Sequence, residues 1–317
     1  MDNLTHSMLG AVLGQTGLKK KTGLGMAALI IGANIPDIDA ACTLMGTQSL
    51  VLRRGITHGV LAMMILPLIL TAILMQFDIS QTRRGTRPPD RLPVRPGWLL
   101  LLSFIGTASH PLLDSFNSYG VRMMAPFSSR WFYGDMLFII DLILWVILIG
   151  GFIWSRRAEN TGAVNWAWRG RIALLVASGY VLLNSMITDI AESWTLARFR
   201  DAGEEQVQIV ANPVPLAFWR RDMLWRTYDG RYGNFDFNMF GFTLPLIEED
   251  GPRTGMDDPA IIPIVKRSKD ARAFLYWSRM PIARFRSDGA LVLTDQRFAG
   301  SFARNNFTVI IPSNRKR

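Results

Sequence analysis

Residues 56–77 read Ile-Thr-His-Gly-Val-Leu-Ala-Met-Met-Ile-Leu-Pro-Leu-Ile-Leu-Thr-Ala-Ile-Leu-Met-Gln-Phe. This stretch decides the class of protein, because it contains no Asp, Glu, Lys or Arg and is as long as the roughly 20 residues that span a bilayer. Further apolar segments surround it, at about 24–46, 97–118, 134–154 and 171–190. We therefore expect a mainly α-helical, polytopic membrane bundle with about five spans.

The two ends of the chain differ in character. Residues 3–17 form a shorter apolar segment, which is either a short span or a helix at the membrane interface. The chain opens Met-Asp-Asn without a basic leader, so no cleavable signal peptide is expected. We expect residues 1–190 to form the membrane domain and 191–317, which are polar and Arg-rich, to form a small β-rich extramembrane domain. Polar–apolar alternation begins at residues 206–211 and turn signals follow at 212–213, 229–230 and 288–289.

The net charge of +10 points to contact with anionic lipid or an anionic substrate. Nucleic acid is a weaker explanation, because many of the arginines lie in short loops beside the apolar segments. The single cysteine, Cys42, excludes an intrachain disulfide and leaves the redox compartment open. No protein partner can be named from the sequence.

Twelve basic residues occupy alternate loops, within residues 19–21, 83–95 and 156–171. Lys and Arg in short loops mark the cytoplasmic side of a membrane. The opposite ends of the segments, and the tail from about 191, would then be periplasmic in a Gram-negative inner membrane. Arg53 and Arg54 lie on that supposed outside and count against the assignment. In either orientation, the three histidines and the aspartates near them fall at one membrane face.

The sequence His110-Pro-Leu-Leu-Asp114 places an imidazole and a carboxylate at i and i+4, on one face of a helix. The pair could bind one metal, or Asp114 could orient His110. Pro111 disfavours a continuous helix, so we expect Ser109 to cap a restarted turn. The alternative is a polar helix end at the interface, but such residues at the end of a span are costly without partners.

Residues 34–39, Asn-Ile-Pro-Asp-Ile-Asp, place two carboxylates inside an apolar stretch. Pro36 biases the residue before it away from the helix, so we expect a break there whose backbone lines a cavity. In an extended segment Asp37 and Asp39 would share a face, and both are predicted metal ligands. The alternative is an ordinary loop between two helices.

His58 opens the longest apolar run and is another predicted ligand. We expect Thr57 to cap the helix and the helix dipole to keep His58 neutral, the form that binds metal. Arg54 could hold an anionic substrate or a developing negative charge, with contact to lipid headgroups as an equal alternative.

Three more residues near the same face carry weaker expectations. His6, in the pair Thr5-His6, is either a ligand or an interfacial histidine. Asp135 lies at the end of the 134–154 segment and is expected to complete the site in a catalytic role. Asp141 lies about two turns deeper, where an aspartate should have a partner or line water.

Imidazoles and carboxylates without thiolates suit zinc first, with manganese and iron as alternatives. An open coordination position would activate a water for hydrolysis of an ester or phosphoester, with a lipid as one candidate substrate.

The competing hypothesis is a non-catalytic membrane protein, either a metal or ion transporter or a regulatory partner. A transporter should carry polar residues through the full bilayer depth. The predicted ligands are His6, Asp37, Asp39, His58, His110 and Asp114.

At these motifs the chain resembles the YdjM-like family of inner-membrane, metal-dependent hydrolases, also described as LexA-binding. The resemblance covers about residues 1–155 and implies a metal site, although its motifs do not specify a reaction. One departure is Arg53, where the family often has His. Another is Gly59, where relatives commonly have Ser. The motifs are residues 1–6 (Met-Asp-Asn-Leu-Thr-His), 36–39 (Pro-Asp-Ile-Asp), 54–58 (Arg-Gly-Ile-Thr-His), 110–114 (His-Pro-Leu-Leu-Asp), 120–127 (Gly-Val-Arg-Met-Met-Ala-Pro-Phe) and 134–135 (Gly-Asp).

Overall fold

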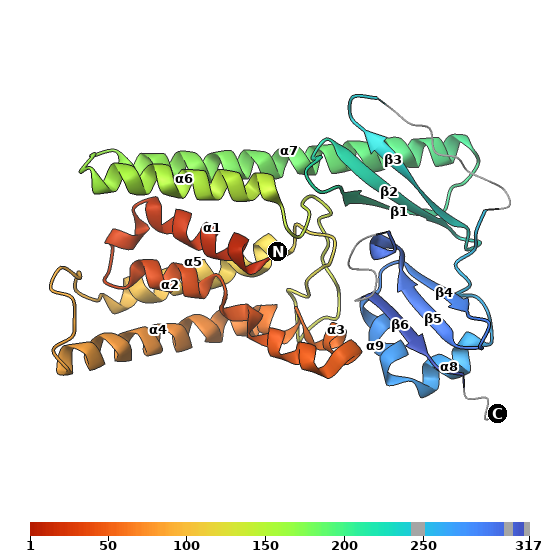
Figure 1. Cartoon of the computed structure of the whole chain (residues 1–317), viewed down its shortest axis with the longest axis horizontal. Coiled ribbons are helices and arrows are strands. Elements are labelled where there is room, and N and C mark those ends of the chain that lie inside the picture. Colours follow the sequence, from red (N-terminus) through yellow and green to blue (C-terminus); the bar gives the residue numbers. More distant parts are fainter. Residues whose placement is uncertain (242–250, 301–306, 314–317) are drawn as a thin grey trace. The chain divides into compact units, whose positions relative to one another are not determined.

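The computed structural model describes residues 1–241, 251–300 and 307–313 (Figure 1). The chain divides into two compact units. The first comprises Met1–Asp39 and Arg54–Ser185, and the second comprises Ala40–Arg53 and Met186–Arg317. The boundary near residue 185 falls inside one long helix, α7 (Trp166–Asp201).

The first unit is a helix bundle in which α2 packs against both α1 and α5, α4 against α5, and α1 against α6. Glycines make two of these contacts close: a Cβ added to Gly10 or to Gly106 would lie 2.7 Å from the carbonyl oxygen of Leu29. Small residues at such positions let membrane helices approach closely. The elements are α1 (Asn3–Gln15), η1 (Leu18–Lys20), α2 (Gly25–Gly32), η3 (Ile56–His58), α4 (Val60–Arg83), α5 (Pro96–Asp114), α6 (Leu142–Asn160) and the first part of α7 (Trp166–Asp201).

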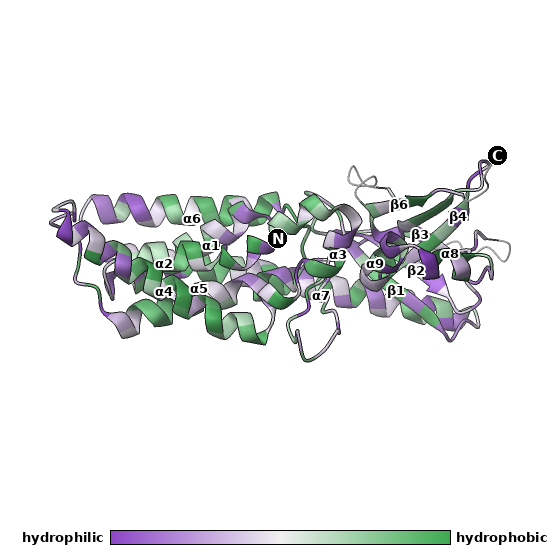
Figure 2. Cartoon of the chain, turned by 90° about the horizontal axis from the view of Figure 1, so that it is seen from below, coloured by the Kyte–Doolittle hydropathy of each residue, from purple (hydrophilic) through white to green (hydrophobic). Residues whose placement is uncertain are grey.

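Within the described residues, three helical segments are long and apolar enough to cross a membrane: Gly25–Leu52, Val60–Arg83 and Trp166–Asp201. The expected count of about five is not confirmed, because α5 and α6 are not among them. Helix α6 ends in a charged turn with Arg156, Arg157 and Glu159, and α5 contains polar site residues. Apolar residues dominate the middle of the bundle helices, and polar residues gather at the loops (Figure 2).

The segment after α2 breaks as Pro36 predicts, since the α-helix ends at Gly32. It continues as 3₁₀ turns and a single α-turn, η2 (Ile35–Gln48) and α3 (Ser49–Leu52), rather than as an extended chain.

Three local expectations were wrong. Helix α4 begins at Val60 with Gly59 as its N-cap, so Thr57 caps nothing and His58 lies in the preceding 3₁₀ turn. Helix α5 continues through Pro111 to Asp114, because the proline removes only one N–H donor near the helix end. Residues 134–141 are not helical, and Asp141 is the N-cap of α6, where its side chain accepts from the N–H of Leu144 at 2.9 Å.

The described part of the second unit contains two small antiparallel sheets, which confirms the β-rich C-terminal region. The first sheet packs on the last part of α7, where Ile187, Ala191 and Phe199 meet its apolar face. The predicted turns at 229–230 and 288–289 connect neighbouring strands, whereas 212–213 are the last two residues of β1 rather than a turn. In chain order the elements are β1 (Val207–Pro213), β2 (Arg220–Thr227), β3 (Tyr232–Asn238), α8 (Ile261–Arg267), α9 (Lys269–Trp277), β4 (Pro281–Phe285), β5 (Leu291–Asp295), η4 (Gln296–Phe298) and β6 (Thr308–Ile311).

Candidate metal centre

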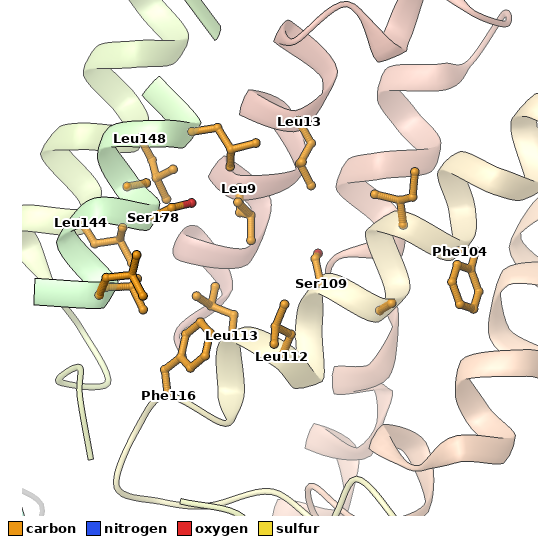
Figure 3. A pocket seen from close by; sticks show the side chains of 16 residues that line it. Leu9, Leu13, Phe104, Ser109, Leu112, Leu113, Phe116, Leu144, Leu148 and Ser178 are labelled. Carbon is orange, nitrogen blue, oxygen red and sulfur yellow. The ribbon is translucent and has the colours of Figure 1, made fainter. Parts of the chain in front are cut away.

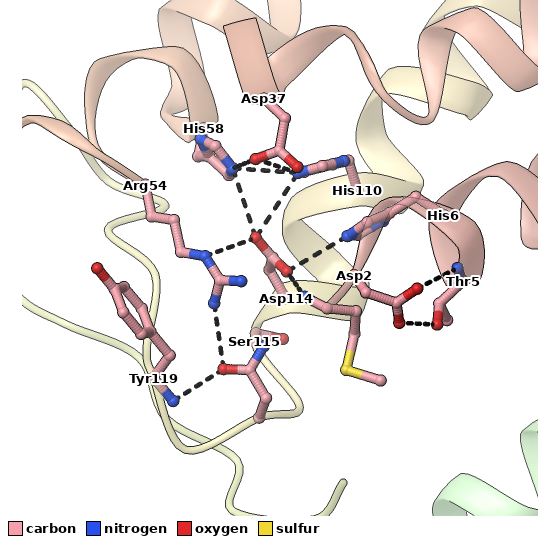
Figure 4. A network of polar contacts seen from close by, with 12 residues as sticks. Asp2, Thr5, His6, Asp37, Arg54, His58, His110, Asp114, Ser115 and Tyr119 are labelled. Carbon is pink, nitrogen blue, oxygen red and sulfur yellow. Dashed lines mark hydrogen bonds and ion pairs between the residues drawn. The ribbon is translucent and has the colours of Figure 1, made fainter. Parts of the chain in front are cut away.

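Two histidines and two aspartates from three separate elements converge inside the first unit (Figure 4). The Nε2 atoms of His58 and His110 lie 3.1 Å apart. The Oδ1 atom of Asp37 lies 3.8 Å from the first and 3.5 Å from the second. The Oδ2 atom of Asp114 lies 3.4 Å and 3.6 Å from the same two nitrogens. Both histidines and Asp114 are completely buried.

These separations fit ligand atoms around one cation. Zinc–nitrogen and zinc–oxygen bonds of about 2.0–2.2 Å place neighbouring ligand atoms of a tetrahedron roughly 3.3–3.6 Å apart. The ligand atoms of Asp37, His58 and His110 lie within 4.8 Å of one another, and so do those of His6, His110 and Asp114. His110 belongs to both groups. Five of the six predicted ligands are therefore brought together.

The outer nitrogen of each imidazole is held by a group that fixes the tautomer. His110 Nδ1 lies 2.6 Å from the carbonyl oxygen of Ala33, which can only accept, so Nδ1 carries the hydrogen. His58 Nδ1 lies 2.9 Å from the hydroxyl of Thr57, which itself donates to Asp39 at 2.6 Å. That hydroxyl therefore accepts from His58 Nδ1. In both rings Nε2 faces the centre, the arrangement typical of metal-binding histidine.

Asp39 occupies a different place from the one predicted. Its Oδ2 atom lies 3.5 Å from His58 Nδ1, on the far side of the ring from Asp37. The cause is the local backbone, since in a 3₁₀ helix with three residues per turn two side chains two positions apart diverge. Asp39 therefore supports His58, and Asp37 faces the centre.

His6 is buried against the other face of the cluster. Its ring stacks on that of His110, with 3.7 Å between centroids, and its Nε2 lies 3.4 Å from Asp114 Oδ1. Neither ring nitrogen makes a hydrogen bond to any described residue. Buried polar atoms are rarely left in this state unless a water, ion or ligand completes them. This favours the ligand interpretation of His6 over the interfacial one.

Arg54 adopts a left-handed backbone conformation with φ of +52°, which is uncommon for a residue other than glycine. Its N–H donates to Asp39 at 2.9 Å, and its carbonyl accepts from the N–H of Arg122 at 2.9 Å. The buried guanidinium then reaches Asp114, with 3.2 Å between Nε and Oδ2. Such a conformation persists where surrounding contacts impose it, often at functional sites.

The sequence did not predict the two residues that contact the guanidinium of Arg54 opposite Asp114, namely Asn117 and Tyr119. Its Nη1 donates to Asn117 Oδ1 at 3.2 Å, and its guanidinium lies over the ring of Tyr119, 4.6 Å from the centroid. Asn117 also accepts from the N–H of Tyr119 at 2.9 Å. The available signal was position, because both residues follow Asp114 within five positions. The amino group of Met1, which contacts Asp114, was also missed.

The remaining predicted residues lie outside the two ligand groups. Asp135 is buried and has a φ of +52°, but it belongs to neither group. Asp141 has the partner that was expected for it, since the hydroxyl of Tyr180 donates to its carboxylate at 3.1 Å, in addition to the cap at Leu144.

Comparison with known proteins assigns a family to the part of the chain that contains this cluster. Over 140 residues the chain is 30% identical to the "Uncharacterized protein YfhP" of Bacillus subtilis (strain 168), and the match covers 41% of this chain and 39% of that relative. The chain thus aligns with about two fifths of the relative's length. No solved structure matches significantly. The model of the family described as "YdjM inner membrane protein" matches residues 1–191, which include every residue of the cluster. The chain therefore belongs to the YdjM inner membrane protein family.

Proposed function

We propose that this membrane protein is a metal-dependent hydrolase that cleaves an ester or phosphoester at one face of the bilayer. One observation carries the proposal. The Nε2 atoms of His58 and His110 face the carboxylates of Asp37 and Asp114 within 3.8 Å, while the outer nitrogens of both rings are hydrogen-bonded to other groups. Both rings are therefore oriented as metal-binding histidines are.

The donor set fits a divalent cation. Two imidazoles and two carboxylates, with His6 beside them, are ligands of zinc, manganese or iron, and the buried ring nitrogens of His6 make no hydrogen bond within the described part of the chain. His58, His110, Asp37 and Asp114 would hold the cation. A bound cation of this kind supplies a water nucleophile at neutral pH by lowering the pKa of that water.

Arg54 supplies positive charge beside these ligands. Asn117 and Tyr119 fix the plane of its guanidinium, so it is oriented before a substrate arrives. A preorganised donor of this type stabilises negative charge that develops on a phosphoryl or acyl oxygen, and removing one such donor typically costs 10²–10³ in kcat. We assign it that role and place the site on the periplasmic side.

The structure offers less support for transport than the sequence did. Asp141 was the one acidic residue expected deep in a span, and it lies at the start of α6 instead. The buried ionisable residues of the cluster come from the ends of α2, α4 and α5 that face away from the basic loops.

Metal analysis of the purified protein tests the proposal. Wild type should retain a stoichiometric divalent metal, whereas the double variant His58→Ala with His110→Ala should lose it and should no longer hydrolyse bis-p-nitrophenyl phosphate. Ser155→Ala is the matched control, because Ser155 is a buried polar residue of the same bundle that bonds Gln15 and Trp166. Equal metal content in all three proteins would refute the site. Metal retention without hydrolysis of phosphoesters or esters would refute the reaction.

A further inference from the structure

An apolar cavity of about 590 Å³ opens inside the first unit between α1, α5, α6 and α7 (Figure 3). This volume is in the range of small-molecule sites. Leucine and phenylalanine side chains dominate its walls, among them Leu9, Phe104, Leu112 and Leu148. Its contents must therefore be apolar.

The cavity and the metal centre share helix α5. Phe104, Ala108, Leu112 and Phe116 recur at intervals of four along the cavity side, from the helix into the turn after it. His110 and Asp114 lie on a different face of the same helix, abreast of the last two of these residues. The cavity thus extends from the level of the metal centre toward the middle of the bundle.

The length of the cavity matches one leaflet. Within α5, the nine-residue interval from Phe104 to Leu113 corresponds to about 14 Å at the rise of an α-helix. Half of the roughly 30 Å hydrocarbon core of a bilayer is about 15 Å. A single extended acyl chain would run this distance from a headgroup at the metal centre.

The polar group of Ser109 in the cavity wall needs no hydrogen-bond partner from a ligand. The hydroxyl of Ser109 is satisfied within its own helix, where it donates to the carbonyl of Gly106 at 2.7 Å. Near the metal centre, by contrast, large apolar side chains are exposed. Ile56, two residues before His58, is 66% exposed, and Phe127, two residues after the Ala125 that packs on Gly59, is 73% exposed. Such residues suit the membrane interface, where lipid headgroups lie.

We propose that the substrate is a phospholipid whose acyl chain occupies this cavity while Arg54 binds its phosphate beside His58 and His110. This inference rests on the proposed hydrolase function and adds the substrate class. In the reaction, the oxygen of water bonds to phosphorus and the phosphorus–oxygen bond to one alcohol breaks. One proton of the water ends on the released alcohol and the other goes to solvent.

The test is photolabelling of the protein in nanodiscs with a phosphatidylglycerol that carries a diazirine in its acyl chain. Ser178→Trp and Ala108→Phe each place an aromatic ring in the cavity, and the first starts from an exposed wall residue, which spares the core. Leu175→Trp is the control, because Leu175 is 72% exposed on the same helix and does not line the cavity.

We expect saturable labelling of α5 and α7 peptides in wild type and in Leu175→Trp, and a loss of it in both cavity variants. Hydrolysis of phosphatidylglycerol should fall at least about tenfold in the cavity variants, while bis-p-nitrophenyl phosphate hydrolysis and metal content stay unchanged. Equal labelling in the cavity variants and the control would overturn the inference. Saturable labelling that persists in the His58→Ala, His110→Ala protein, without hydrolysis by wild type, would support the chain site and refute only the reaction.

Discussion

Asp37 and Asp39 are separated by one residue, yet they contact opposite nitrogens of the same imidazole. Asp37 approaches His58 Nε2 at 3.8 Å, and Asp39 approaches Nδ1 at 3.5 Å. The same carboxylate of Asp39 also accepts from the N–H of Arg54 and the hydroxyl of Thr57. A single side chain therefore lies against both the outer nitrogen of His58 and the backbone N–H of Arg54, which makes Asp39 a positioning residue.

Asp39→Asn should weaken metal binding by about 10- to 100-fold, the usual effect of losing a carboxylate behind a metal-binding histidine. The number of bound metals should stay the same, because every ligand atom at the centre remains. Titration of the metal-free protein with zinc against a competing chelator measures this affinity. Asp141→Asn is the control, since it weakens the cap of α6 without touching either histidine. Unchanged affinity in Asp39→Asn, or an equal loss in the control, would argue against the positioning role.

For single residues, the sequence identified the side chains of the site better than it identified their hydrogen-bond partners. His58, His110, Asp37 and Asp114 were found because imidazoles and carboxylates at the ends of apolar segments are costly without a purpose. The carbonyl of Ala33, which orients His110, could not be found, since any residue offers a carbonyl and only the packing of α2 on α5 brings this one within 2.6 Å. Asn117 depends on tertiary packing in the same way.

Helix α2 is the element that holds the centre together. Helix α2 packs between α1 and α5. A Cβ added to Gly10 of α1 or to Gly106 of α5 would clash with the carbonyl oxygen of Leu29 in α2. Its C-terminal end then provides the Ala33 carbonyl and leads directly into Asp37. The close approach of these helices therefore fixes how near His6, on α1, lies to His110, on α5.

Gly10→Ala should lower both the thermal stability and the metal affinity of the protein. The new methyl group would lie 2.7 Å from Leu29 O and 2.9 Å from Ile30 Cα, so α1 must move away from α2. Overpacking of this kind typically costs about 1–3 kcal/mol. The control is Gly150→Ala in α6, which adds the same methyl group where no atom lies within 4 Å. The melting temperature in detergent and the zinc titration should change only in the first variant, and equal effects would contradict this account of the packing.

The predictions that failed at the element scale share a cause. Capping rules suggested Thr57 as the start of a helix, but its hydroxyl donates to Asp39, 18 residues earlier in the chain. Proline rules suggested a break at residue 111, but the bundle keeps α5 intact to Asp114, which aligns His110 and Asp114 on one face. Local propensity is a weak prior that tertiary context overrides. The apolar run at 56–77, which depends on the solvent rather than on a partner, was easier to locate, since α4 covers Val60–Arg83.

In the membrane unit, the basic loops and the His–Asp cluster lie at opposite ends of the helices. Glu159, at the end of α6, pairs with Lys19, with Lys20 at 3.4 Å and with Arg156 at 2.8 Å, so loops far apart in sequence meet. Arg91 pairs with Asp78 at the end of α4. The His–Asp cluster occupies the other ends of these helices. The sequence predicted this separation from alternate loops alone. The ion pairs of Glu159 join the first and third basic loops, and the N–H of Gly23, which donates to the carbonyl of Pro93 at 3.0 Å, brings the second loop to the same end.

The positive-inside rule then predicts the orientation of the whole molecule. Alkaline phosphatase, which folds only in the periplasm, should be active when fused after residue 317, and a green fluorescent protein inserted at Gly85, among the basic loops, should fluoresce. Long tails cross the membrane largely regardless of their charge, so the Arg-rich second unit does not oppose this outcome. Expression of each fusion must be matched by immunoblot. An inactive phosphatase after residue 317 that becomes active at Gly85 would reverse the orientation, and it would place the metal centre and the substrate's headgroup in the cytoplasmic leaflet.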